Sequence, residues 1–143
     1  MANVTRAIIR AGGAAHIGLY RAFGGRLAGK MAGLNLLVLT VRGRKTGVEH
    51  THMVSYFEDA GRYVVTGSAG GMPSEPQWFR NLRSADQAVV EIGRRRLPVS
   101  VAVATPEERA ILWEKLIAQS PGFAKYQAKV ERVIPMAALT PLP

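Results

Sequence analysis

The chain has 143 residues, 48% of them hydrophobic, which is the size of one ordinary globular domain and leaves no room for a second core. It contains no cysteine, so disulfide frameworks, iron–sulfur clusters and thiolate zinc sites are excluded. The net charge of +9 is unevenly placed, because eight Lys and Arg residues and no acid precede Glu49, and the rest of the chain carries only +1. Such a basic N-terminal part favours an anionic partner: nucleic acid, a membrane surface, or a phosphorylated or carboxylated small molecule.

Residues 1–33 are expected to form a basic amphipathic helical segment that is weakened at its two glycine pairs, Gly12-Gly13 and Gly24-Gly25. The segment either packs across an open end of the main fold or lies at a membrane surface with its basic face toward anionic headgroups. No apolar run approaches the roughly 20 residues that span a bilayer, and arginines interrupt any signal-like stretch. We therefore expect a cytoplasmic protein, with peripheral association at the inner face of the plasma membrane as one option.

From residue 34 onward the sequence predicts short antiparallel strands joined by tight turns, at 36–42, 49–57, 62–68, 88–93, 96–104 and 133–139. A short helix is expected over 75–84. Thr105-Pro106-Glu107-Glu108 predicts the start of a helix running to about residue 119, with Thr as cap, Pro in the first position and Glu completing a capping box. A further helix is expected from Pro121 to about residue 130. This order favours a mainly β fold with α helices, a six-stranded antiparallel barrel over 34–143, rather than alternating βαβ units.

The turn Arg42-Gly43-Arg44-Lys45-Thr46-Gly47 carries the first candidate site. Its glycines allow successive backbone N–H groups to aim at one point, and its cationic side chains and hydroxyl add to them. We interpret it as an anion cradle, with a solvated hairpin tip as the alternative. It lacks the longer glycine spacing of a P-loop.

The second candidate site is the strand end Thr66-Gly67-Ser68-Ala69-Gly70-Gly71 with the helix that follows it. Small residues there would let a flat ring approach the backbone. Trp78 and Asn81 lie three residues apart and share a helical face, so they would offer an apolar surface beside an amide. Phe79 and Leu82 are expected to dock the helix on the barrel.

These stretches, together with Leu36 to Gly47, Pro76 to Leu82 and Arg132-Val133-Ile134-Pro135, resemble the deazaflavin-dependent nitroreductase family over roughly residues 34–143. The resemblance implies a split β-barrel that binds coenzyme F-420. It also implies that the reduced cofactor passes a hydride to a quinone, an activated nitro compound or an enone.

Carried over residue by residue, the resemblance places contacts to the cofactor's phosphate and oligoglutamate tail on Arg44, Lys45, Thr46, Gly47 and, at a position where members often have arginine, His50. Contacts to the ring fall on Thr66, Gly67, Ser68, Ala69, Gln77, Trp78 and Asn81, with Ala69 standing where members often have lysine. Substrate contacts fall on Ser55, Phe123 and Tyr126, and the hydroxyl of Ser55 or Tyr126 is the candidate proton or hydrogen-bond donor to the acceptor.

The remaining patterns set the alternatives. His50 and His52 point to the same side of a predicted strand, but without a third ligand nearby we predict no metal site. The rival functions are a split barrel of the same shape that binds FMN, haem or a lipid, or a non-catalytic basic module at a membrane or on nucleic acid. Nucleic acid is disfavoured because the basic residues lack interleaved aromatics. A lipid quinone is a possible acceptor, and a homodimer a possible assembly.

Overall fold

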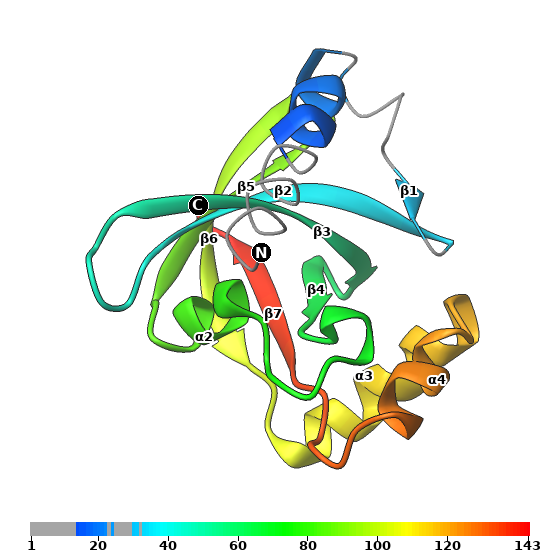
Figure 1. Cartoon of the computed structure of the whole chain (residues 1–143). Coiled ribbons are helices and arrows are strands. Elements are labelled where there is room, and N and C mark those ends of the chain that lie inside the picture. Colours follow the sequence, from blue (N-terminus) through cyan, green and yellow to red (C-terminus); the bar gives the residue numbers. More distant parts are fainter. Residues whose placement is uncertain (1–13, 23, 25–29, 32) are drawn as a thin grey trace, which may run out of the picture.

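Six antiparallel strands close into a barrel in the computed structural model, which describes residues 14–22, 24, 30–31 and 33–143 (Figure 1). Around the barrel each strand pairs with the next in the order β2-β3-β4-β7-β6-β5, and β5 pairs back onto β2. The strands are β2 (Leu34–Arg42), β3 (Glu49–Asp59), β4 (Arg62–Thr66), β5 (Gln87–Ile92), β6 (Arg95–Val103) and β7 (Met136–Pro141). Closure leaves these strands without a long free edge.

The barrel interior follows from the two-residue alternation of the strands. Leu37, Leu39 and Val41 on β2 point inward and meet Val54 of β3 and Val90 of β5 in one buried cluster. Helix α2 (Gln77–Arg83) packs onto this cluster with Phe79 and Leu82, both fully buried. The expectation that these two side chains dock the helix is confirmed.

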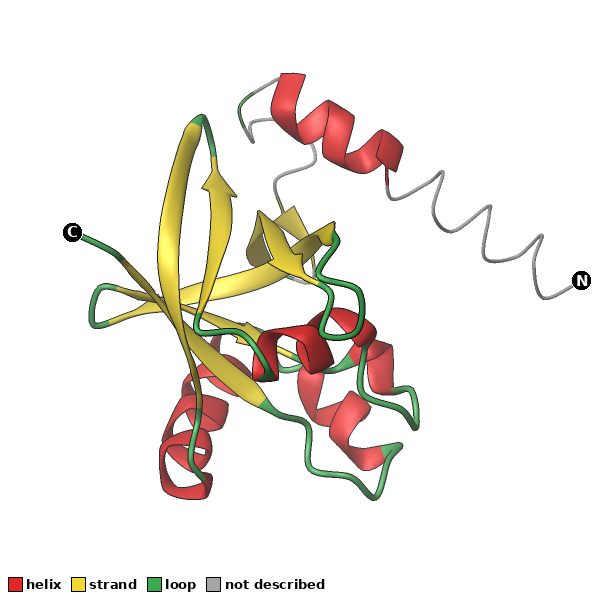
Figure 2. Ribbon diagram, turned by 90° about the vertical axis from the view of Figure 1, so that its left-hand side faces the viewer, coloured by secondary structure: helices red, strands yellow, loops and turns green. Residues whose placement is uncertain are grey.

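Two sets of helices cover the outside of the barrel (Figure 2). Helix α3 (Pro106–Gln119) packs Leu112 and Leu116, and helix α4 (Phe123–Ala128) packs Phe123, in one cluster with the outward residues Val64 and Met136. A helical segment at 14–22 lies over β2, where Tyr20 is buried against Leu36 and Val38. The part of the predicted basic N-terminal segment at 14–22 thus packs on the barrel, while its residues 1–13, 23, 25–29 and 32 lie outside the described residues.

Most predicted elements are present, and the fold class is confirmed. Helix α3 has the predicted bounds, and the Thr105 hydroxyl accepts a hydrogen bond from the Glu108 N–H at 3.3 Å. The last strand begins at Met136 rather than at residue 133, because the residues before it form a loop whose Arg132 side chain binds other loop carbonyls. The two-residue strand β1 (Lys30–Met31), paired with β2, was not predicted.

No helix in the described part of the chain combines the length and hydrophobicity that crossing a bilayer requires.

Candidate cofactor site

The basic turn and helix α2 meet through one buried amide. Asn81, only 6% exposed, accepts two hydrogen bonds with its Oδ1, one from the backbone N–H of Arg44 at 3.1 Å and one from Arg44 Nη1 at 2.7 Å. Gln77, one turn earlier on the same helix, accepts from Arg44 Nη2 at 2.9 Å. The Arg44 guanidinium is therefore held in one orientation by two neutral acceptors, so its positive charge stays available to a ligand.

The backbone of the turn differs from the predicted cradle. The N–H groups of Gly43 and Gly47 bond to Val48 and Gly43 carbonyls, that of Arg44 bonds to Asn81, and the Thr46 hydroxyl accepts from the Val48 N–H. These three backbone donors are thus used within the protein and do not converge on an outside anion. The prediction of a cradle of successive backbone amides is wrong for them, and side-chain charge has to provide the attraction.

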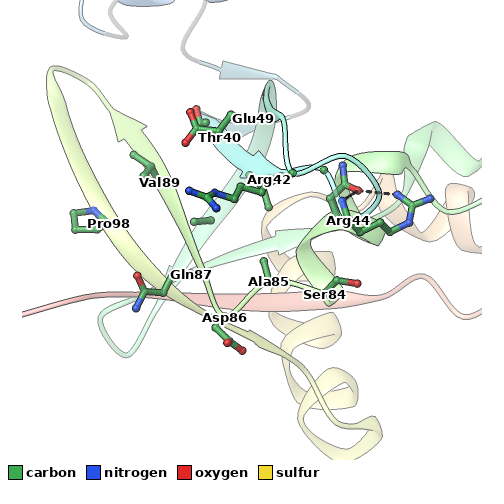
Figure 3. Close-up of a pocket in the computed structure, with 15 residues that line it drawn as sticks. Thr40, Arg42, Arg44, Glu49, Ser84, Ala85, Asp86, Gln87, Val89 and Pro98 are labelled. Carbon is green, nitrogen blue, oxygen red and sulfur yellow. Dashed lines mark hydrogen bonds between the residues drawn. The ribbon is translucent and has the colours of Figure 1, made fainter.

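Two hollows adjoin the Arg44 side chain, and Gly43, Arg44 and Asn81 line both of them. One, of about 700 Å³, also includes Lys45, Thr46, His50, Thr51, His52 and Gln77. The other, of about 640 Å³, extends between β2 and β5 (Figure 3). Volumes of this size suit small-molecule ligands.

Arg42, the first residue of the basic turn, is a further cation of this region and was not among the predicted cofactor contacts. It reaches from the end of β2 into the second hollow, beside Val89, Gln87 and Pro98 (Figure 3). Its position directly before Gly43 in the basic turn could have identified it as a candidate ligand contact from the sequence. In the part of the chain that the structure describes, the carboxylates lining that hollow are Glu49 and Asp86.

The small-residue end of β4 and the loop after it pack closely on helix α2. A β-carbon at Gly67 would lie 2.9 Å from Phe79 Cδ2 and 3.0 Å from Pro135 Cγ, so glycine is required there by contact. Thr66 is buried, and Ala69 has a positive φ of 49°, which is uncommon outside glycine. Trp78 is partly buried against the barrel core and meets Phe79 edge to face. Helix α2 is thus shared by the basic turn and the strand end.

Arg132 holds this strand-end loop in place, a role that the sequence did not reveal. Its guanidinium donates to the carbonyl oxygens of Gly67 at 3.2 Å, Ser68 at 3.1 Å and Met72 at 3.2 Å. Gln127 of α4 in turn donates to the Arg132 carbonyl at 2.8 Å. These hydrogen bonds therefore connect the loop after β4 to the segment before β7, which is far away in the sequence.

The predicted substrate residues have different surroundings. Phe123 is 4% exposed and belongs to the core under α3 and α4, so its ring is part of the packing. Tyr126 stacks edge to face on Phe123 and lies against the strand-end loop, since a β-carbon at Gly71 would come within 3.1 Å of the Tyr126 Cα. Ser55 is half-buried on β3, opposite Leu36. None of the three lines the two hollows at Arg44.

His50 and His52 both line the larger hollow, as their alternation on β3 predicts. Burial, with a smaller contribution from the charge of His50, lowers the pKa of His52 below its ordinary value of 6.5. Among the described residues, no group of three or more His, Cys, Asp or Glu side chains is placed to hold a metal ion.

This lowered pKa predicts an effect on stability. As the pH falls through and below 6.5, the unfolded chain takes up a proton on His52 that the folded chain resists, so the free energy of unfolding decreases. The stabilising contribution of neutral His52 is therefore fully present above the pKa that this histidine has in the unfolded chain, and it is lost as the pH falls below that pKa. We expect His52→Gln to remove part of this loss, as urea unfolding between pH 5 and 8 would measure. Parallel stability curves for the two proteins would contradict the assignment.

The barrel, the basic turn and helix α2 together define a split-barrel protein with two hollows of small-molecule size beside a cationic side chain. Over residues 14–141 the sequence matches the family model described as F420H(2)-dependent quinone reductase. The chain belongs to this family and is an oxidoreductase that uses coenzyme F-420, which confirms the cofactor and enzyme class expected from the resemblance.

Individual relatives agree with this assignment. A Mycobacterium tuberculosis protein provisionally named an F420H(2)-dependent quinone reductase is 36% identical over 105 residues, covering 73% of this chain and 88% of the relative. A second protein of that species, named an F420H(2)-dependent quinone reductase, is 29% identical over 129 residues, 87% of each chain. Among solved structures, an F420-H2 dependent reductase, FDR-A, has a TM-score of 0.66 at 28% identity and covers 73% of this chain and 92% of its own.

Proposed function

We propose that this chain binds the acidic tail of F-420 at Arg44 and transfers the hydride of the reduced cofactor to a quinone. The observation that carries the proposal is the Arg44 guanidinium, fixed by Asn81 and Gln77 at the border of two hollows. The donor set fits the cofactor, because a phosphate and carboxylates need charged hydrogen-bond donors and Arg44 is accompanied by Lys45 and Arg42. When bound, the reduced deazaflavin supplies the hydride.

The residues of the chain then have the following proposed roles. Arg44 and Lys45 bind the tail, with Thr46, Gly47 and His50 around them. The backbone from Thr66 to Ala69 lies against the ring, and Gln77 and Trp78 border it. Asn81 acts mainly by holding Arg44, because its oxygen is already taken by two donors. Little further side-chain chemistry is needed, since the protein orients the reactants and excludes water.

The quinone is the proposed acceptor because the relatives of this chain are named for it. A lipid quinone would fit association of the N-terminal segment with a membrane surface, which we propose together with a location at the inner face of the plasma membrane. Tyr126, beside the strand-end loop, and Ser55 on β3 are the proposed hydroxyl donors to the acceptor oxygen.

The tail contact can be tested by binding. We expect Arg44→Gln to weaken F-420 binding roughly 10- to 150-fold, because a charged hydrogen bond contributes about 1.5 to 3 kcal/mol. Arg83→Gln is the matched control, since this arginine lies on α2, the helix that holds Arg44 in place, but pairs with Glu75. Titration followed by tryptophan fluorescence, with FMN as a second ligand, measures the effect. Equal affinity of wild type for FMN and F-420, or no loss with Arg44→Gln, would reject the proposal.

The hydroxyl roles need a separate experiment. In Ser55→Ala/Tyr126→Phe we expect the turnover of a soluble quinone at saturating cofactor to fall about 10²-fold or more, the usual scale of general acid catalysis. The affinity for F-420 is expected to stay within about twofold. Unchanged turnover would show that neither hydroxyl assists the acceptor.

A further inference from the structure

The tip of the β5–β6 hairpin carries three consecutive arginines: Arg94 in the two-residue turn with Gly93, whose φ is 61°, and Arg95 and Arg96 at the start of β6. All three side chains are exposed. None of them makes a hydrogen bond or an ion pair with another side chain of the described residues. Three uncompensated guanidinium groups at one hairpin tip are a strong positive patch on a protein surface.

Glu91, the acid that lines this region among the described residues, does not neutralise the patch. Glu91 is the cross-strand partner of Arg96, but its carboxylate accepts two hydrogen bonds from Arg21 of the N-terminal helix, at 3.0 and 2.7 Å. Arg21, Glu91 and the tip line one hollow of about 260 Å³. Four arginines and a single carboxylate surround it, which suits a phosphate-sized anion that forked guanidinium groups can bind.

The hairpin tip and the helix at 14–22 form one surface. The Tyr20 hydroxyl, on a side chain that is 2% exposed, accepts from the Gly93 N–H at 2.8 Å and donates to the Glu91 carbonyl at 3.4 Å. The Arg94 stem lies against Gly24, where a β-carbon would come within 2.8 Å of Arg94 Cγ. Both elements lie at the end of the molecule away from α3 and α4 (Figures 1 and 2).

An exposed apolar side chain accompanies the charges. Leu19 on this helix is 46% exposed, next in sequence to the buried Tyr20. Cations that face phosphates beside an apolar residue that can enter the acyl boundary are the combination found in proteins that lie on membranes. The described residues at the tip include no aromatic ring on which bases could stack, which disfavours single-stranded nucleic acid.

We infer that the β5–β6 tip, with Arg21 and Leu19 of the N-terminal helix, is a docking surface for anionic phospholipid membranes. The inference extends the proposed membrane association from the N-terminal segment to a rigid part of the barrel. It does not depend on deazaflavin binding, so the failure of either proposal leaves the other standing.

The test is sedimentation of the full chain with vesicles of phosphatidylcholine alone or with 30% phosphatidylglycerol. We expect wild type to bind the anionic vesicles at least tenfold more strongly, and added salt to weaken that binding. In Arg94→Gln/Arg95→Gln/Arg96→Gln, binding to the anionic vesicles should fall roughly 100-fold, from a loss of about fivefold per cation near the surface. Binding to phosphatidylcholine should not change.

The matched control is Arg80→Gln/Lys125→Gln/Lys129→Gln, which removes the same charge from α2, α4 and the residue that follows α4, and should retain wild-type vesicle binding. Circular dichroism of both variants checks that they are folded. Vesicle binding of the tip variant equal to that of wild type, or an equal loss in both variants, would overturn the inference. So would a wild type that binds a single-stranded oligonucleotide more tightly than anionic vesicles and loses that binding in the tip variant.

Discussion

Asn81→Asp is expected to reduce the affinity for F-420 by roughly 10- to 100-fold while leaving the fold intact. The aspartate has nearly the same shape and still accepts from the Arg44 N–H and guanidinium, whose present distances are 3.1 and 2.7 Å. Its carboxylate, however, neutralises the charge that the proposed tail contact requires, and a lost charged contact costs about 1.5 to 3 kcal/mol. The effect is thus electrostatic and separable from packing.

Fluorescence titration gives the affinity, and thermal unfolding shows whether the fold is retained. Asn35→Asp, at an exposed position of β2, is the control for a change in net charge alone and is expected to bind as wild type does. In the double variant Arg44→Gln/Asn81→Asp, the aspartate should cause little further loss of F-420 affinity beyond that of Arg44→Gln, since both substitutions act on the same guanidinium. Wild-type affinity in Asn81→Asp would mean that the Arg44 charge does not bind the tail.

Phe79→Ala is expected to cost about 3 to 5 kcal/mol of stability, the usual range for a buried phenylalanine. The ring is fully buried, fits against Gly67 and Trp78, and joins α2 to the barrel core. Because the free energy of unfolding of a small domain is only about 5 to 15 kcal/mol, this single change would remove a large fraction of it. Helix α2 also carries Gln77 and Asn81, so a loosened helix should release Arg44 and weaken cofactor binding as well.

Urea unfolding measures the loss, and Phe79→Leu is the matched control, with an expected loss well below that of alanine because most of the volume is kept. A loss below about 1 kcal/mol in Phe79→Ala would show that α2 is held by other contacts. Saturating F-420 should recover part of the stability of the variant, since a ligand that binds only the folded state stabilises it.

Local patterns explain which predictions succeeded. Helix α3 was predicted to its bounds because Thr105, Pro106 and Glu108 act within one turn. The strands were found because apolar residues alternate along them and short turns separate them. The basic turn and the strand end were selected for their composition, and the structure places both against α2, as the shared ligand would require.

Other features depend on residues that are far apart in the chain. The residues next to Arg44 and Asn81 in the sequence do not show that these two side chains, 37 positions apart, meet and that the amide orients the arginine. They also do not show that the N–H groups of Gly43 and Gly47 form hydrogen bonds within the turn. Arg132 binds carbonyls more than 60 positions away and delays the last strand to Met136. Burial of Phe123 likewise follows from how α3 and α4 pack.

The sequence by itself thus determined the class of fold, the cationic turn and the helix start, because each rests on neighbouring residues and their intrinsic preferences. Only the tertiary structure decided which side chain orients which, where Arg42 and Arg132 point, and that the β5–β6 tip joins the N-terminal helix. Those outcomes depend on barrel closure, which brings distant segments together and fixes the partner available to each charge.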